Sequence, residues 1–420
     1  MHKSLVAKPS IAFQVFGCRL NQAEAEGWQH ALIREGYPIV SPKEADVLCV
    51  HSCAVTEPAV REVAKLLRHL QRTRPLQRII LSGCATRLVE GITPHLSIAH
   101  EVKAEWLPRV LNYLSELSTP PTTILTTSAP HRTRASLIIQ DGCDQFCAYC
   151  IVPYLRGSPV SEPSDDLIHR ATQLFAEGYP EIVLTGCHLA LYKDPLTGGN
   201  FIDLLKRLCD IPGEGRFRIG SLEPCILDDV ELIRLIAQSG GRICNFLHLP
   251  IQSADDDLLR RMGRRYTQTD VRRVLDTLCE TLPNCGLSAD LIAGLPGETE
   301  AAFDQTVQLL KAYPFTGAHI FPYSKRAGTP AATFPDQIPQ PEIIRRAKVL
   351  RNVAHTQQLQ QLQRQIGQPL QVIPEQAQGD VRYGWSSERF HVRLPASYPR
   401  GKCISVSPSR LENDTLIVTE

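Results

Sequence analysis

Residues 136–150, SLIIQDGCDQFCAYC, decide the fold, because a strand-like apolar run leads directly into three closely spaced cysteines. These loop cysteines, Cys143, Cys147 and Cys150, follow the pattern C-x3-C-x2-C. A structural zinc site needs a fourth ligand, and the common four-cysteine iron–sulfur patterns need a further thiolate. Three thiolates without an obvious fourth favour a [4Fe–4S] cluster with one iron open to another ligand. The alternative is a zinc knuckle whose fourth ligand lies far away in the sequence.

Strand-like runs continue after this motif, and helix-compatible segments separate them. The predicted strands cover residues 136–140, 181–185, 216–220, 245–250, 286–293 and 317–323. Six repeats of this kind predict a βα barrel or part of one. Unusual stretches such as TGCHL, SLEP and GLPGE come just past the strands. Because the catalytic face of a βα barrel is built from the loops after its strands, we predict an active site at that end.

The chain before this barrel also alternates between strands and helices, which predicts a parallel α/β sheet. The predicted strands are 11–16, 46–51 and 78–82, and the predicted helices are 22–35 and 57–72. A cysteine follows each strand, and we call Cys18, Cys53 and Cys84 the edge cysteines. Since the carboxyl ends of parallel strands share one edge of a sheet, we expect these three thiols to converge.

The remaining segments complete the predicted domain organisation. A stretch rich in Pro, Ser and Thr before the barrel indicates a linker, and short β-like runs after Gly367 indicate a small all-β module. A basic helix over 342–364 precedes that module. The predicted parts are therefore an N-terminal α/β domain over 8–118, a linker over 119–135, a barrel with its basic helix over 136–364, and a β-module over 365–420.

The composition of the 420 residues is that of an ordinary globular chain, with 43% hydrophobic and 21% charged residues. The net charge is only +1, which excludes attachment to nucleic acid by bulk charge alone. No apolar run reaches the length of a membrane span, and the first residues lack the apolar core of a secretory signal. We therefore expect a cytoplasmic protein. In that reducing compartment, several of the 14 cysteines are expected to bind metal or take part in chemistry.

The C-x3-C-x2-C loop at the start of a six-repeat barrel resembles the radical S-adenosylmethionine superfamily. Three stretches upstream, FGCRLNQAEAE, HSCAVTEPA and SGCAT, resemble the methylthiotransferases within it. Downstream, RGSPVSEP, SLEP, DLIAGLPGETE and FPYSKRAGTPAA fit the same family, so that the resemblance extends from Ile11 to Pro335. The tail resembles a TRAM module, an RNA-binding β-barrel common in this family. The stretches GCRLN, VLTG and SLEP look most like the branch that methylthiolates N6-threonylcarbamoyladenosine beside the anticodon of tRNA.

This resemblance implies two [4Fe–4S] clusters and S-adenosylmethionine as cofactors. The loop cysteines would hold the cluster that binds S-adenosylmethionine, whose reductive cleavage yields a 5′-deoxyadenosyl radical. The edge cysteines would hold a second cluster, whose open iron carries the sulfur to be transferred. The radical would remove hydrogen from C2 of the adenine. The implied partners are a tRNA anticodon stem-loop, an electron donor and a sulfur source, with no membrane.

Other site residues are expected from their positions. The residues expected to bind the cofactor are the polar strand ends Glu181, Ser221, Glu223 and Gln252. The residues expected to bind RNA are Arg68, Arg72, Arg264, Arg265, Arg393 and Lys402. The alternative for each basic residue is a solvated surface. Cys187 and Cys225 follow TG and SLEP, near the expected site, and we expect them to be buried inert thiols.

Several alternative functions remain open at this point. The chain could act on isopentenyladenosine in tRNA or on an aspartate of a ribosomal protein, and the neutral tail fits RNA binding less well than a basic one. A non-catalytic iron–sulfur protein that binds RNA, or a sulfur carrier, would not need a complete cofactor barrel. A second cluster that only transfers electrons would have a fourth protein ligand.

Overall fold

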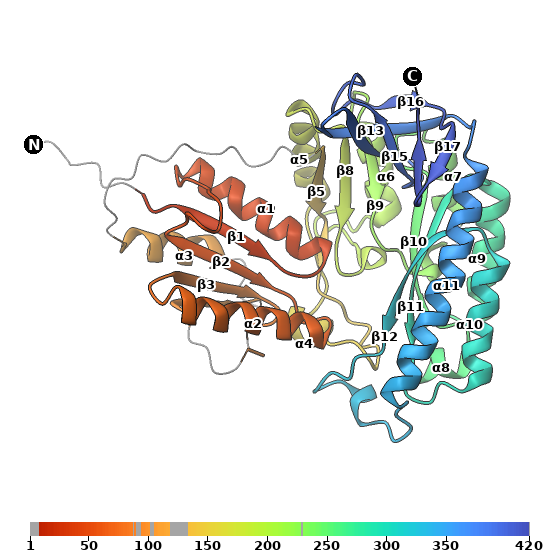
Figure 1. The fold of residues 1–420 in the computed structure, drawn as a ribbon, viewed down its shortest axis with the longest axis horizontal. Coiled ribbons are helices and arrows are strands. Elements are labelled where there is room, and N and C mark those ends of the chain that lie inside the picture. Colours follow the sequence, from red (N-terminus) through yellow and green to blue (C-terminus); the bar gives the residue numbers. More distant parts are fainter. Residues whose placement is uncertain are drawn as a thin grey trace, which may run out of the picture. The chain divides into compact units, whose positions relative to one another are not determined.

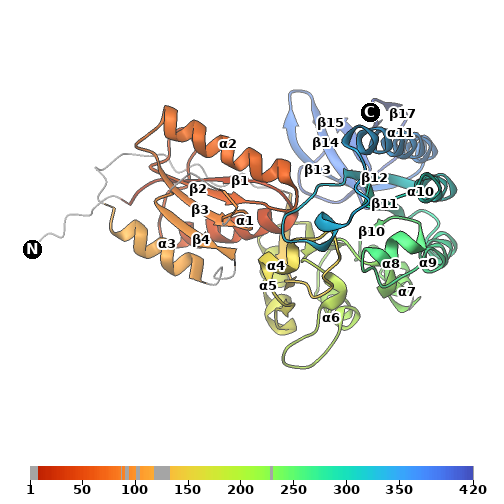
Figure 2. The same ribbon diagram turned by 90° about the horizontal axis from the view of Figure 1, so that it is seen from below.

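The computed structural model describes residues 8–86, 88–89, 94–100, 105–117, 133–227 and 230–419 (Figures 1 and 2). It divides the chain into two compact units. The N-terminal unit comprises Met1–His131 together with Cys150–Ser158, and the barrel unit comprises Arg132–Tyr149 and Pro159–Glu420. The chain therefore leaves the barrel unit just after Tyr149 and returns to it at Pro159.

The N-terminal unit is built on a parallel sheet in the order β1-β2-β3-β4. Its strands are β1 (Ile11–Val15), β2 (Val47–Ser52), β3 (Arg78–Gly83) and β4 (Leu96–Ala99). Its helices are α1 (Arg19–Arg34), α2 (Glu57–Thr73), α3 (Trp106–Ser115) and α4 (Val152–Arg156). Every residue of β2 is buried, as expected for a central parallel strand covered on both faces.

Helices pack on both faces of this sheet (Figure 2). On one face, Leu32 of α1 and Trp106 of α3 join Ile80 in one core, and the rings of Trp28 and Trp106 stack with centroids 4.2 Å apart. On the other face, α2 packs its apolar stripe, which includes Val63 and Leu67. The predicted strands and helices are confirmed to within a few residues. The short strand β4 and helix α3 were not predicted.

The barrel unit contains six parallel strands in two neighbouring sheets, β5-β8-β9 and β10-β11-β12, so the predicted barrel strands are confirmed. Isolated bridges link β9 to the segment around β10, one of them between Ser221 and His248. The strands are β5 (Arg134–Ile138), β8 (Glu181–Thr185), β9 (Arg216–Ile219), β10 (Phe246–Gln252), β11 (Gly286–Ala293) and β12 (Phe315–Pro322). A further two-stranded sheet pairs β6 (Gln140–Asp141) with β7 (Val160–Ser161).

Helices cover the outside of these strands, and one continuous apolar core lies between the two layers. The helices are α5 (Ser164–Ala176), α6 (Phe201–Cys209), α7 (Val230–Gln238), α8 (Asp256–Arg261), α9 (Gln268–Thr281), α10 (Glu300–Ala312) and α11 (Gln340–Arg364). The 3-10 helices among the described residues of this unit are η2 (Leu189–Leu191), η3 (Pro224–Leu227) and η4 (Pro330–Thr333).

The chain ends in an all-β module, as predicted, and this module has its own apolar core. Its six strands pair in the order β16-β13-β14-β15-β18-β17. They are β13 (Leu370–Gln378), β14 (Val381–Ser386), β15 (His391–Pro395), β16 (Ile404–Val406), β17 (Arg410–Glu412) and β18 (Thr415–Ile417). The module belongs to the barrel unit. The predicted linker over 119–135 lies mostly outside the described residues, and the predicted domain boundaries remain predictions.

Candidate functional site

The edge cysteines lie just past the carboxyl ends of neighbouring strands, as the sequence predicts. Cys18 is the N-cap of α1, Cys53 follows β2 directly, and Cys84 follows β3. A side chain on Gly17, whose φ is +96°, would overlap the Cys53 thiol, so Cys53 lies directly against the residue before Cys18. The amide of Cys84 donates to the carbonyl of Ser52 at 3.0 Å. Because Ser52 precedes Cys53, this hydrogen bond places Cys84 close to Cys53. The three thiols therefore converge at one edge of the sheet.

The environment of these thiols fits metal binding. Burial raises the pKa of Cys53, and it raises the pKa of Cys84 to about 11 despite the nearby charge of Arg156. The protein alone therefore keeps both groups as thiols near neutral pH. Soft thiolates at one edge suit an iron–sulfur cluster or zinc, and bound metal would supply the positive charge that deprotonation needs.

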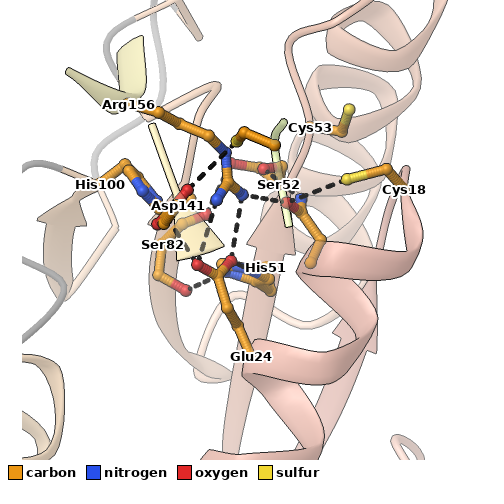
Figure 3. A network of polar contacts seen from close by, with 12 residues as sticks. Cys18, Glu24, His51, Ser52, Cys53, Ser82, His100, Asp141 and Arg156 are labelled. Carbon is orange, nitrogen blue, oxygen red and sulfur yellow. Dashed lines mark hydrogen bonds and ion pairs between the residues drawn. The ribbon is translucent and has the colours of Figure 1, made fainter. Parts of the chain in front are cut away.

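A buried polar network that was not predicted lies next to the edge cysteines (Figure 3). Arg156 donates to Asn21 Oδ1 at 2.7 Å and to Glu24 Oε2 at 3.2 Å. Glu24 Oε2 also lies 3.0 Å from Nε2 of His51, whose Nδ1 lies 3.0 Å from Ser82 Oγ. The network joins α1, β2, β3 and the segment after the loop cysteines, all within the N-terminal unit.

Within this network, Arg156 and Glu24 form a buried ion pair next to the edge cysteines. Burial raises the pKa of Glu24, but the hydrogen bond with His51 and the charge of Arg156 outweigh it, so that the pKa lies well below its usual range. The stretch RLNQAEAE contains a sequence signal for this buried network. There, Asn21 and Glu24 share the buried face of α1 with Leu20, where an amphipathic helix normally places apolar residues.

Two of the loop cysteines, Cys143 and Cys147, lie next to a second group of polar side chains, in the barrel unit. Arg264 Nη1 lies 3.3 Å from the thiol of Cys147, which is buried, and Arg264 Nη2 lies 2.6 Å from Glu223 Oε1. Gln145, between the cysteines, donates to Glu223 Oε2 at 2.7 Å. Cys143 is half-buried in the same unit, and Cys150 is the first residue of the segment that belongs to the N-terminal unit. Glu223 therefore lies beside the cysteine loop, and its role in cofactor binding stays a prediction.

The charge of Glu223 follows from its partners. Burial raises the pKa of this carboxyl, but the hydrogen bond with His188 and the charge of Arg264 outweigh it and hold the pKa at about 2. His188 Nε2 lies 3.2 Å from Glu223 Oε2. An ionised carboxylate next to a cysteine loop is suited to bind the ammonium or hydroxyl groups of a ligand.

The other predicted cofactor residues lie in different places. Ser221 is exposed, two residues past the end of β9, and its backbone bridges to His248. Gln252 ends β10 with φ +68°. Both positions are compatible with the prediction, which stays a prediction.

The prediction that Glu181 lies at the cofactor end of the barrel is wrong. Glu181 is the first residue of β8, and its strand partner is Arg134, the first residue of β5. Its carboxylate is fully buried and pairs with Arg216 and Arg218, each at 2.7 Å. Glu181 therefore forms buried ion pairs at the start of its strand and does not face the loops that carry the cysteines.

The RNA-binding interpretation of Arg264 is also wrong, because only 4% of its side chain is exposed and it contacts Cys147 and Glu223. Local sequence could not distinguish it from Arg265, which is exposed. On α2, Arg68 and Arg72 are exposed. In the C-terminal module, Lys402 is exposed, whereas Arg393 is half-buried and pairs with Glu412 at 3.0 Å.

Two further cysteines flank the carboxylates of this region. Cys187 Sγ lies 3.2 Å from Asp141 Oδ1, and Cys225 Sγ lies 3.9 Å from Glu223 Oε2. We expected buried inert thiols at both positions, but Cys225 is exposed and Cys187 is half-buried.

A partial βα barrel whose first strand leads into a C-x3-C-x2-C loop defines a radical S-adenosylmethionine enzyme. The model of the Radical SAM superfamily matches residues 137–310, and that of uncharacterized protein family UPF0004 matches residues 10–94. In structure, the chain is similar to the radical S-adenosylmethionine methyltransferase TsrM from Kitasatospora setae. The TM-score is 0.55 at 15% identity, over 77% of this chain and 75% of that one.

Two relatives indicate the family within the radical S-adenosylmethionine enzymes. The chain is 30% identical to threonylcarbamoyladenosine tRNA methylthiotransferase MtaB of Thermotoga maritima, over 87% of this chain and 86% of the relative. It is 35% identical to the protein of the same name from Bacillus subtilis, over 88% and 85%. The chain therefore belongs to the radical S-adenosylmethionine methylthiotransferase family. It is an enzyme, and its cofactors are S-adenosylmethionine and [4Fe–4S] clusters. Among the helices in the described part of the chain, none has the length and apolarity needed to cross a bilayer.

Proposed function

We propose that this chain methylthiolates C2 of N6-threonylcarbamoyladenosine next to the anticodon of tRNA. The observation that carries the proposal is the convergence of the edge cysteines in the N-terminal unit, as a triad distinct from the loop cysteines. A radical enzyme that only cleaves S-adenosylmethionine needs a single cysteine triad. In the proposal, the second triad serves the insertion of sulfur. The substrate is taken from the names of the two relatives.

The side chains divide the work between the two units. In the proposal the loop cysteines hold one cluster and the edge cysteines hold the other. S-adenosylmethionine, when bound, supplies the radical and the methyl group. Glu223 is ionised and held by Arg264 and His188, so it is prepared to bind a polar end of the cofactor. Arg264 also places its guanidinium group 3.3 Å from the Cys147 sulfur, and so helps to position this ligand of the proposed cluster.

The proposed partners are a tRNA anticodon stem-loop, an electron donor and a sulfur source, and the proposed location is the cytoplasm. RNA binding is assigned to exposed cations, and α2 offers Arg68 and Arg72 on its solvent side. Arg265 and Lys402 are exposed in the barrel unit and are further candidates.

The test is mass spectrometry of tRNA nucleosides from cells with and without the gene. We expect cells without the gene to lose the 2-methylthio form of N6-threonylcarbamoyladenosine and to accumulate the unmethylthiolated nucleoside. A gene copy with Cys53→Ala should not restore the product, whereas a copy with Cys209→Ala, a half-buried cysteine on α6, should restore it.

Other outcomes would identify the alternative substrates. Loss of the 2-methylthio form of isopentenyladenosine instead would redirect the assignment to that tRNA nucleoside. Unchanged nucleosides together with a mass change on a ribosomal protein would refute a tRNA substrate.

A further inference from the structure

A polar cluster on the sheet β10-β11-β12 has no role in the function proposed above. It consists of His248 on β10, Asp290 on β11 and His319 on β12, and Asp290 and His319 are direct strand partners. Asp290 Oδ1 lies 2.9 Å from His248 Nε2 and 3.1 Å from His319 Nδ1. Because one rigid sheet carries all three residues, their mutual geometry is set before any ligand arrives.

The cluster presents hydrogen-bond acceptors. Burial raises the pKa of Asp290, but its hydrogen bonds with both histidines outweigh it and hold the pKa at about 2. An ionised carboxylate only accepts, so each imidazole donates to it through the near nitrogen. An imidazole without a charge that donates through one nitrogen can accept at the other, which is Nδ1 in His248 and Nε2 in His319.

One of these acceptors is unsatisfied. The side chain of His248 is only 8% exposed, and its Nδ1 is buried without a hydrogen-bond partner among the residues that the structure describes. Such an atom costs folding free energy, so it points to a ligand that brings a donor.

The cluster opens on one side, next to an exposed aromatic ring. The exposed fraction of the side chain rises from 8% at His248 to 21% at Asp290 and 53% at His319. Phe321 lies two residues further along β12, and therefore on the same face, with 39% of its surface exposed. Its ring centroid is 6.4 Å from that of His319. The open side therefore combines a surface for stacking with acceptors for N–H groups.

The cluster also adjoins the candidate cofactor site. The backbone of His248 bridges to Ser221, and its carbonyl accepts from the amide of Leu222 at 2.9 Å. Glu223, which contacts Arg264 beside the cysteine loop, is the next residue. A ligand on the cluster would thus lie in the same unit as the loop cysteines' barrel and next to the strand that ends at the cofactor residues.

We infer that His248, Asp290, His319 and Phe321 form the subsite that receives the target base, an adenine whose N6 substituent presents N–H donors. The ring stacks on the aromatic side chains, and its N–H groups face the acceptors of the cluster. This inference rests on the proposed function. Chemistry on a base inside a stem-loop requires that base to leave its stack and enter a pocket that reads it by stacking and hydrogen bonds.

The test uses the holoenzyme and an anticodon stem-loop with 2-aminopurine beside the target base, so that fluorescence rises when the target base leaves the stack. Phe321→Ala should reduce this increase in fluorescence and weaken binding of the stem-loop about 10-fold. This loss is within the range expected when one base–aromatic stack is removed. His355→Ala is the matched control, because His355 is an exposed histidine on α11 that pairs with a single carboxylate, Asp414, at 3.0 Å. It should behave as wild type.

A second comparison tests the acceptors. Wild type should bind a stem-loop with an N6-substituted adenine more tightly than one with unsubstituted purine at the target position. Asp290→Asn keeps the shape of the side chain but replaces an acceptor by a donor, and it should remove this preference.

The outcomes separate the inference from the proposed function. If wild type binds and methylthiolates the stem-loop while Phe321→Ala and Asp290→Asn match His355→Ala in both assays, the inference is wrong and the proposed function stands. A wild type that neither binds nor modifies the stem-loop overturns the proposed function, and the inference with it. Tight zinc binding in wild type that is lost in Asp290→Asn would make the cluster a metal site and would also overturn the inference.

Discussion

Among single residues, Glu181 shows how a buried charge is stabilised in this protein. Its carboxylate is fully buried, and it is shared by Arg216 and Arg218, whose side chains are 5% and 3% exposed. Burial raises the pKa of Glu181, but the charges of the two arginines outweigh it and hold the pKa at about 2. Removing one member of such a group leaves buried charges without a partner, which costs more than the group contributes net.

We therefore expect Glu181→Gln to destabilise the barrel unit by about 3–5 kcal/mol in denaturant unfolding at neutral pH. The ordinary pKa of the group is 4.5 and the folded value is about 2, so its stabilisation is fully present above pH 4.5 and is lost as pH falls toward 2. Wild type should lose stability in this window more steeply than the variant. Glu231→Gln, in an exposed pair with Lys206, should change stability by less than about 1 kcal/mol. Equal effects of the two substitutions would contradict the argument.

The cysteines lead to a prediction of iron content. Protein reconstituted without oxygen should hold about eight irons per chain, from two cubane clusters. Replacing the three edge cysteines by alanine should leave about four, measured by iron analysis. The control is a triple alanine variant at cysteines away from both triads, Cys209, Cys279 and Cys403. The control should keep about eight, and full iron retention without the edge cysteines would disprove the second cluster.

Among the elements, α2 combines a buried apolar stripe with an exposed basic side. Val63, Leu67 and Leu70 are buried against the sheet, and Arg68 and Arg72 are exposed. Charge reversal of both arginines should weaken tRNA binding without affecting folding, because neither side chain packs in the core. If each makes one phosphate contact, the slope of log affinity against log salt should decrease by about 0.9 per contact. The measurement is tRNA binding over a salt series.

The matched control for α2 is Arg109→Glu on α3, an exposed arginine that pairs with Glu105 at 2.6 Å. Reversal there should leave the salt slope unchanged. A slope that is unchanged in the Arg68/Arg72 variant as well would show that α2 is an ordinary solvated helix.

For the molecule as a whole, the C-terminal module is bound to the barrel through buried polar contacts. Arg218 donates to the carbonyls of Ser386 and Ser387, each at 2.9 Å, and Arg216 donates to the carbonyl of Gln371 at 3.1 Å. A side chain on Gly286 would overlap the carbonyl of Glu388, so the two backbones are in direct contact. The module therefore helps to satisfy the buried arginines of the barrel.

Deleting residues 365–420 should consequently lower the melting temperature of the remaining barrel and not only its affinity for tRNA, because two buried guanidinium groups lose acceptors. Calorimetry of the full and truncated chains measures this effect. The control is the double variant Arg400→Ala and Lys402→Ala, which removes two positive charges at exposed positions but keeps the module folded. It should leave the melting temperature unchanged. A truncated chain as stable as the full one would show that the module is only a tethered RNA-binding domain.

The sequence by itself determined most of the strands and helices, though not β4 or α3, and it determined the metal-binding candidates. Strand and helix periods are local properties, and a cysteine directly after a predicted parallel strand has only one edge of the sheet to occupy. The positions of the edge cysteines and the loop cysteines, the six barrel strands and the all-β tail all followed from such local patterns.

Only the tertiary structure decided which polar residues share a site. Glu181 and Glu223 both lie near strand ends in the sequence, yet one pairs with buried arginines at a strand start and the other lies beside Cys147 through Arg264. Arg156 joins Glu24 across more than a hundred residues, and His248 meets His319 through Asp290. Such contacts depend on which strands become neighbours and on which end of each strand faces the loops. Local periodicity shows which face of a strand is buried, but it does not show which other strand lies beside it or which side chains of that strand it meets.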